Sequence, residues 1–306
     1  MKRIPRSLSL SLGGVLVASV CLNYVSAAPK FSAWAAPTNL TVLNSAFNEG
    51  GPAISKDGLS LYFQSDRPGG QGLADLYVSE RESVEDPWGP PQNLGAVVNT
   101  AFNDNVANLS RDQHYLFFAS DRPGGAGNLD MWVSWREHTH DNFGWQPAVP
   151  LVPLNSASID AGPASFDGGE GGAPQLFFAS DRPGGSGSLD IFLSEQDAEG
   201  NFGPPVRIEE LASPLADQAP EISHDGLAMY LQSSRVGSAG PADLWVATRP
   251  TVSDPWSAPA NLGPIVNSPF TDGQPSLSND RRSLNFFSGR PGGAGGNDLY
   301  LTTRTK

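Results

Sequence analysis

The sequence is poor in cysteine and in basic residues. Its 306 residues contain one cysteine, Cys21, and 19 Lys and Arg against 32 Asp and Glu, which gives a formal charge of −13. A single thiol excludes an internal disulfide framework. The shortage of positive charge argues against nucleic acid and anionic membranes as partners, and favours cations, basic proteins or neutral glycans. A solvated acidic surface without a specific partner explains this charge equally well.

Long apolar runs are also absent, except near the N-terminus. Three positive residues precede an apolar stretch at residues 8–22, and small residues follow up to Ala27. This pattern predicts a signal peptide at residues 1–27, and hence a periplasmic or secreted protein with no transmembrane segment after cleavage. Cys21 suggests lipidation as an alternative, but residues 18–20 before it (Ala-Ser-Val) lack the leucine and the final small residue typical of such sites.

Glycine and proline are abundant, and they mark a fivefold repeat. The phrase Ser65–Gly70 (SDRPGG), followed by Asp75–Ser79 (DLYVS), recurs four more times with variations. Its arginines lie 55, 60, 53 and 55 residues apart. They are Arg67, Arg122, Arg182, Arg235 and Arg290. This period is too long for a helical solenoid and is typical of a four-stranded propeller blade.

Within each module, short alternating runs are separated by turns rich in Gly, Pro, Asn and Asp, which predicts four strands. We therefore predict an all-β fold, a five-bladed β-propeller with four-stranded antiparallel blades, as the single domain of residues 28–306 and as a monomer. After the predicted signal peptide, the first segment is a tryptophan segment at residues 34–40, and the last module, ending at residues 298–301, has none. We expect the N-terminal strand to complete the last blade and to close the ring.

The string Ser55–Arg67 (SKDGLSLYFQSDR) resembles the WD40-like propeller repeat of the TolB type. The longer form, with Asn93–Gly95 and Val98–Thr100 upstream, is similar to repeats of bacterial envelope proteins that also carry a peptidoglycan-binding domain. The resemblance covers residues 31–306 and implies the propeller fold. It implies no activity, because propellers host many functions. TolB's extra N-terminal domain and a peptidoglycan-binding tail are not expected here, so a TolB-like envelope role is an analogy only.

An acidic residue stands just before the first strand of every module, and in a propeller that strand lines the central channel. The five residues are Glu49, Asp104, Asp160, Asp217 and Asp272. We predict a carboxylate ring at one channel mouth that binds a ligand or a metal such as Ca²⁺, which takes oxygen ligands. Apart from this possible Ca²⁺, no cofactor is indicated. The alternative is structural: each carboxylate caps a turn or accepts backbone amides.

A second repeated set surrounds the glycine loops. It pairs the five arginines with Asp75, Asp130, Asp190, Asp243 and Asp298. An aspartate at this place accepts backbone or guanidinium hydrogen bonds, and such a pair in every blade is expected to be structural.

Function is easier to locate where the repeats differ. His138, His140 and Asp141 lie in an insertion of the second module, where they form either a metal site or a plain polar loop. The glycine-rich insertion at residues 167–172 is expected to be a flexible tip, and in the fourth module residues 236–240 replace the glycine loop.

These features favour a non-enzymatic binding or scaffold protein, whose partner is an envelope or extracellular protein or a glycan. One alternative is a glycan-active enzyme, a hydrolase or lyase, that uses the channel carboxylates. Their equivalence in all modules counts against it, because catalysis needs groups in different environments. Another is a lectin that stacks sugars on repeated aromatic residues, which core packing explains as well. These are Phe47, Phe102, Phe270, Trp34, Trp88, Trp145 and Trp256.

Overall fold

The computed structural model describes residues 31–169 and 171–306. The predicted signal peptide, its cleavage site and Cys21 lie outside these residues, so export stays a prediction. The one helix of the described part is a short 3₁₀ turn, η1 (Glu209–Leu211). Within the described residues, no helix has the length and apolar character needed to span a membrane.

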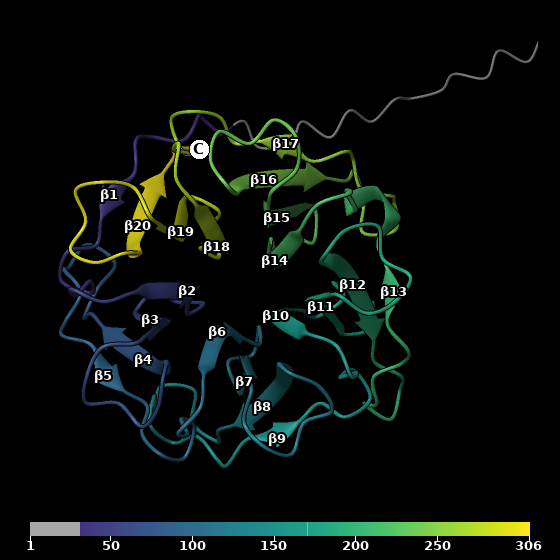
Figure 1. The fold of residues 1–306 in the computed structure, drawn as a ribbon, viewed down its shortest axis with the longest axis horizontal. Coiled ribbons are helices and arrows are strands. Elements are labelled where there is room, and N and C mark those ends of the chain that lie inside the picture. The colour runs from purple at the N-terminus through teal and green to yellow at the C-terminus, as the bar shows by residue number, and fades with distance from the viewer. Residues whose placement is uncertain (1–30, 170) are drawn as a thin grey trace, which may run out of the picture. The chain divides into compact units, whose positions relative to one another are not determined.

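Five four-stranded antiparallel sheets surround a central channel (Figure 1). The first is β2 (Glu49–Ile54), β3 (Ser60–Ser65), β4 (Asp75–Glu80) and β5 (Gln92–Asn93). The second is β6 (Asp104–Leu109), β7 (Tyr115–Ser120), β8 (Asp130–Trp135) and β9 (Val149–Pro150). The third is β10 (Asp160–Phe166), β11 (Gln175–Ser180), β12 (Asp190–Glu195) and β13 (Val206–Arg207). The fourth is β14 (Asp217–Ile222), β15 (Ala228–Ser233), β16 (Asp243–Thr248) and β17 (Ala260–Asn261). The fifth is β18 (Asp272–Leu277), β19 (Ser283–Ser288), β20 (Asp298–Thr303) and β1 (Thr38–Asn39).

The last blade takes its outer strand from the N-terminus, as predicted. Thr38 pairs with Leu301 and Asn39 with Tyr300 in antiparallel register. In Figure 1 the purple β1 lies beside the yellow β20. The predicted all-β five-bladed propeller and its closure are therefore confirmed, and the ring has no long unpaired sheet edge.

Apolar side chains fill the spaces between adjacent blades. One cluster joins Tyr62, Leu76 and Val78 of the first blade to Leu116 and Trp132 of the second. This follows from the alternation in the middle strands, whose two faces pack against different neighbours.

Every inner strand has a bulge two residues after its acidic first residue. The residue at the bulge has a left-handed φ, 53° at Gly51 and 49° at Val106, and the pairing register with the second strand shifts there. A Cβ added to Gly51 would lie 2.9 Å from the Cα of Val106 in the next blade. The bulges thus bring the inner strands into close contact, and the cavity at this level is only about 10 Å³.

Candidate functional site at the channel mouths

The channel has two chemically different mouths. All inner strands run in the same direction, so their acidic first residues share one end, which we call the acid mouth. The turns after the inner strands share the other end, which we call the turn mouth. The bulges lie between the two ends.

At the acid mouth, all five predicted ring residues are at most 1% exposed. Each forms an ion pair with the arginine of its own blade. Arg122 contacts Asp104. In the other four blades the N–O distances are 3.0 Å for Arg67–Glu49, 2.5 Å for Arg182–Asp160, 2.5 Å for Arg235–Asp217 and 2.7 Å for Arg290–Asp272. The same guanidinium also donates to a backbone carbonyl in the connection that leads from the preceding blade, such as Val98 O for Arg122, at 2.6 Å. Each pair therefore joins two blades.

The carboxylates also accept hydrogen bonds from the chain just before them. Asp104 accepts the N–H of Thr100 at 2.6 Å and the hydroxyl of Ser120 at 2.6 Å. Equivalent backbone bonds reach Glu49, Asp160 and Asp272. These are the contacts expected of the structural alternative. Calcium or ligand binding by the ring stays a prediction, and in the described part no three His, Cys, Asp or Glu residues are placed to hold a metal.

The second aspartate set accepts backbone hydrogen bonds, which is one of the two roles predicted for it. The arginines pair with the ring carboxylates rather than with these aspartates. The aspartates instead accept backbone N–H groups of the glycine loops, as Asp190 does from Ser186 at 2.7 Å and Asp243 from Ala239 at 2.8 Å. The reason is that each arginine turns toward the inner strand, while each aspartate begins the third strand beneath the loop.

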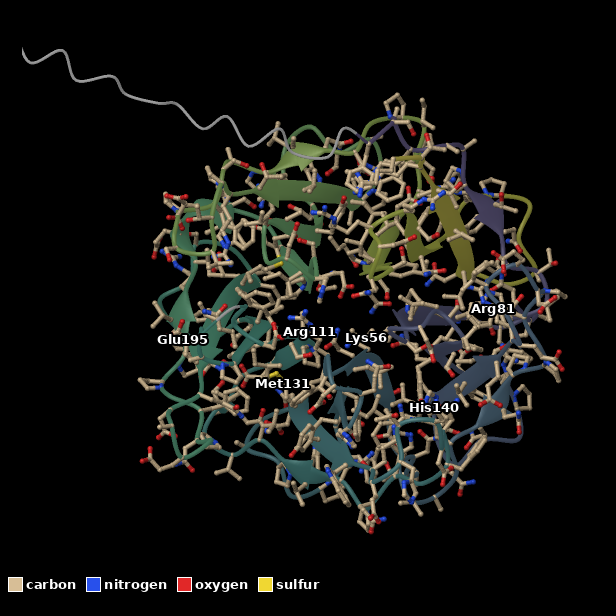
Figure 2. All side chains as sticks on the ribbon, turned by 180° about the vertical axis from the view of Figure 1, so that it is seen from behind. Lys56, Arg81, Arg111, Met131, His140 and Glu195 are labelled. Atoms are coloured by element: carbon tan, nitrogen blue, oxygen red, sulfur yellow. The ribbon has the colours of Figure 1, made fainter. Side chains whose placement is uncertain are left out.

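At the turn mouth, the residue at one repeated position differs in every blade. This position comes after the last residue of the inner strand, either directly or after one serine, and begins the turn to the second strand. The five residues are Lys56, Arg111, Asp167, His224 and Asn279. Together they line a cavity of about 90 Å³ at the end of the channel. Figure 2 shows Lys56 and Arg111 near the centre of the ring, seen from this side. This mouth is the asymmetric place that a unique ligand requires.

Arg111 organises one half of the turn mouth. Its Nη1 contacts Asp167 Oδ2 and its Nη2 lies 2.7 Å from His224 Nε2. Because a guanidinium only donates, His224 Nε2 accepts, which requires a neutral imidazole. Burial, and then the positive charge of Arg111, lower the pKa of His224, consistent with this arrangement.

Lys56 and Asn279 make up the other half. Within the described residues, the Lys56 amine has no ion pair, and neither side chain has a hydrogen bond to another residue. The Lys56 backbone is fixed by its N–H, which donates to Gln113 Oε1 at 3.2 Å. Both residues line the cavity at the channel end and the larger clefts beside it. They are therefore available to a ligand.

Glu221 lies deeper in the channel, on β14. Its Oε1 accepts the N–H of Leu277 at 2.9 Å, and the side chain, only partly open to the channel, lines both the turn-mouth cavity and the constriction. Burial raises the pKa of Glu221 to about 8, although the Leu277 bond acts in the opposite direction. At neutral pH this carboxyl is largely protonated.

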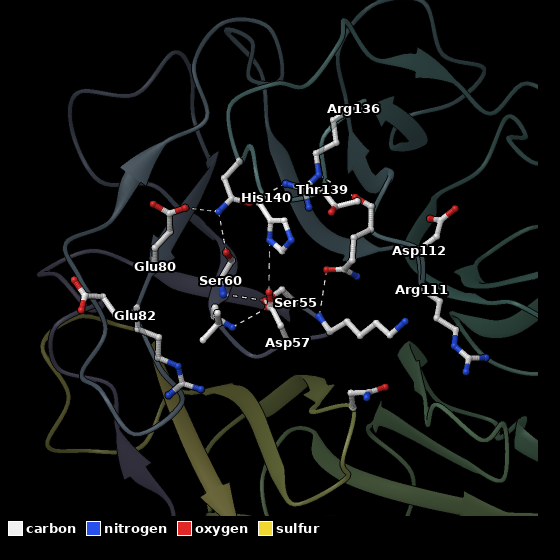
Figure 3. A pocket seen from close by; sticks show the side chains of 16 residues that line it. Ser55, Asp57, Ser60, Glu80, Glu82, Arg111, Asp112, Arg136, Thr139 and His140 are labelled. Carbon is white, nitrogen blue, oxygen red and sulfur yellow. Dashed lines mark hydrogen bonds and ion pairs between the residues drawn. The ribbon is translucent and has the colours of Figure 1, made fainter.

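A cleft of about 800 Å³ extends from the turn mouth over the first and second blades (Figure 3). The insertion of the second module forms one wall. Its Arg136 is buried and donates to Tyr62 Oη at 3.0 Å and to Asn142 at 2.8 Å, while Asn142 donates to Glu80 at 2.6 Å. Because these bonds anchor the loop on the first blade, they also position the exposed His140 at the cleft wall.

Among the described residues, the two histidines of this insertion belong to no cluster of three or more His, Cys, Asp or Glu side chains that could hold a metal. His140 Nδ1 is 4.0 Å from Asp57 Oδ2 across the cleft, and His138 is exposed.

The repeated aromatic residues fall into two groups. Phe47, Phe102 and Phe270 are about 40% exposed, at 42%, 39% and 42%. The tryptophans instead pack beneath arginines, as Trp145 does beneath Arg136 and Trp256 beneath Arg249. The tryptophans therefore serve packing.

Sequence reasoning missed the turn-mouth residues. A signal was present: a Ser-x-Asp sequence follows the inner strand in four of the five modules, at residues 55–57, 110–112, 223–225 and 278–280, and its second residue differs each time. A position that varies within an otherwise regular turn is where an asymmetric site can form.

Comparisons with known proteins add the fold and nothing finer. No protein-family model and no curated protein matches the chain. A thermostable family-43 glycoside hydrolase is similar with a TM-score of 0.60 and 12% identity, over 87% of this chain and 92% of that chain. The catalytic domain of a GH62 α-L-arabinofuranosidase from Coprinopsis cinerea gives 0.62 and 14%, over 89% and 97%. TolB from Acinetobacter baumannii gives 0.51 and 14%, over 87% and 56%. At these identities the comparisons show the five-bladed propeller fold alone; the TolB-type resemblance implied a propeller, and the repeat count implied five blades.

Proposed function

We propose that this protein is an exported, non-enzymatic binding module whose ligand enters the turn mouth of the channel. The observation that carries the proposal is the asymmetry of this mouth. Five equivalent positions hold five different polar side chains around one cavity, and two of these side chains have no partner among the described residues. A symmetric scaffold needs no such variation, whereas recognition of one ligand does.

The turn mouth replaces the acid mouth as the binding place in this proposal. Every acid-mouth carboxylate is already neutralised by an arginine and is buried. A ligand there would have to displace the arginine of every carboxylate that it contacts, and breaking such a buried pair is costly. The turn mouth opens instead to a cleft that can hold several sugar residues or a peptide end.

A ligand panel tests this proposal. Neutral oligosaccharides, acidic sugars and peptides are screened for protection against thermal unfolding, with wild type and an Arg111→Gln, Asp167→Asn double variant. We expect at least one class to raise the melting temperature of the wild type and to lose this effect in the double variant. Protection that is equal in both proteins, or protection by no ligand, would contradict the proposal.

A second candidate is a glycoside hydrolase, favoured by Glu221. A carboxyl that stays protonated at neutral pH is what a general acid requires, and structural neighbours include glycoside hydrolases. The test is release of reducing sugar from a panel of arabinans, xylans and related polysaccharides. Activity in the wild type that Glu221→Gln abolishes would favour the enzyme over the binding module.

A further inference from the structure

We propose that the turn mouth recognises a carboxylate, and that Lys56 and Asn279 are the groups that contact it. This inference rests on the proposed function, because it names the ligand chemistry of the same site.

The five turn-mouth residues differ in whether they have partners. Arg111, Asp167 and His224 contact one another. Lys56 and Asn279 have no side-chain partner among the described residues, although both line the same cavities. They come from adjacent blades, the first and the fifth, whose inner strands are linked by the Ile54 N–H, which donates to Ser276 Oγ at 3.0 Å.

The charge at this mouth also favours an anionic ligand. The aspartates of the neighbouring turns bind within their own turns or to another arginine, as Asp57 does with Ser55 and Asp225 with Arg281. None forms an ion pair with Lys56. The described part of an otherwise acidic protein thus presents one uncompensated ammonium at the end of its channel. A lone cation in such a place favours an anionic group.

The charges at this mouth favour a singly charged anion over a doubly charged one. One unpaired cation balances a single negative charge, and the carboxylate of Asp167, held by Arg111, would repel a doubly charged phosphate. A carboxylate carries one charge and two acceptor oxygens. One oxygen suits the Lys56 ammonium and the other suits the Asn279 amide, which donates through its NH₂ group.

The body of the ligand would then lie in the adjoining cleft. Its walls carry hydroxyl, amide and charged side chains, including Ser60, Gln113 and His140 (Figure 3). Such walls suit a hydroxyl-rich molecule, so the carboxylate of a uronic acid fits the site. A small free carboxylate offers the same chemistry without the sugar.

Isothermal titration calorimetry of the full protein tests the inference with three probes: glucuronate, its uncharged methyl ester, and acetate. The variants are Lys56→Met, which removes the ammonium but keeps the chain length, and Asn279→Asp, which adds a like charge. Lys306→Met is the matched control, because it makes the same chemical change at the exposed C-terminal residue.

We expect the wild type and Lys306→Met to bind glucuronate about tenfold or more tightly than its ester. Lys56→Met should remove that preference, and Asn279→Asp should weaken glucuronate binding by a similar factor. Equal binding of acetate and glucuronate would support the carboxylate and identify its source as a small acid. If ester and acid bind equally in all proteins, the carboxylate assignment is overturned. If acid and ester bind equally to the wild type and the Arg111→Gln, Asp167→Asn variant binds neither, the proposed binding function still stands. If no probe and no panel ligand binds the wild type, both the binding function and the carboxylate assignment are contradicted.

Discussion

Replacing Arg122 by methionine tests whether the acid mouth is a structural joint between blades. Arg122 contacts the buried Asp104 and donates to Val98 O, in the connection between the first and second blades, at 2.6 Å. Its guanidinium also lies 4.9 Å from the ring centre of Phe118 and 5.1 Å from that of Trp132. Methionine keeps much of the apolar contact but removes the charge and all donors.

The expected cost follows from the carboxylate that is left behind. Removing one partner of a buried ion pair typically costs about 3–5 kcal/mol. Asp104 would keep the donors of Thr100 and Ser120, so we expect the lower end, about 3 kcal/mol. For a domain of this size, about 2–4 °C accompany each kcal/mol, which predicts a fall in melting temperature on the order of 10 °C.

Unfolding is followed by tryptophan fluorescence and circular dichroism, in heat and in urea. The control is Arg282→Met, because Arg282 is exposed and forms no ion pair within the described residues. The control should change stability by less than about 0.5 kcal/mol. If Arg122→Met were as stable as the control, the ion pairs would not hold the blades together and the structural account of the acid mouth would fail.

Three further predictions concern the closure, the channel and calcium. Deleting residues 31–42 removes β1 and the Trp34 side chain that packs beside Tyr230, which should cost at least about 3 kcal/mol in urea unfolding; an equally stable deletion would contradict the closure. The pKa of Glu221, about 8, lies above that of unfolded glutamate, so the folded state binds more protons and stability falls as pH rises from about 5 to 8. Unfolding measured across this range should show a smaller fall in Glu221→Gln, and an identical profile would refute the raised pKa. Millimolar calcium should leave the melting temperature unchanged, since arginines already neutralise the acid mouth, and a rise that Asp104→Asn abolishes would instead show calcium binding there.

The fold was predictable because turn-forming residues mark the strand ends in each repeat. The arginine-containing loop after the second strand and the short polar turn after the inner strand recur in every module and mark strand ends, and five similar modules leave few topologies. The closure followed from the order of segments at the two ends of the described chain, where residues 34–40 supply what residues 298–303 lack.

The pairing of the repeated charges was harder to predict. Sequence spacing places Arg67 near both Glu49 and Asp75, and only the direction of the arginine side chain decides between them. The turn-mouth residues escaped because they share no type: a lysine, an arginine, an aspartate, a histidine and an asparagine form no motif. They become a site only when the ring brings five distant turns together.

The most direct test of the central claim is a crystal structure of the protein grown with calcium and soaked with glucuronate. The account predicts density for the sugar acid at the turn mouth, with its carboxylate on Lys56 and Asn279, and an acid mouth in which the arginine pairs are intact. Metal density on Glu49, Asp104 and the other ring carboxylates, together with an empty turn mouth, would contradict it and would return the binding site to the acid mouth.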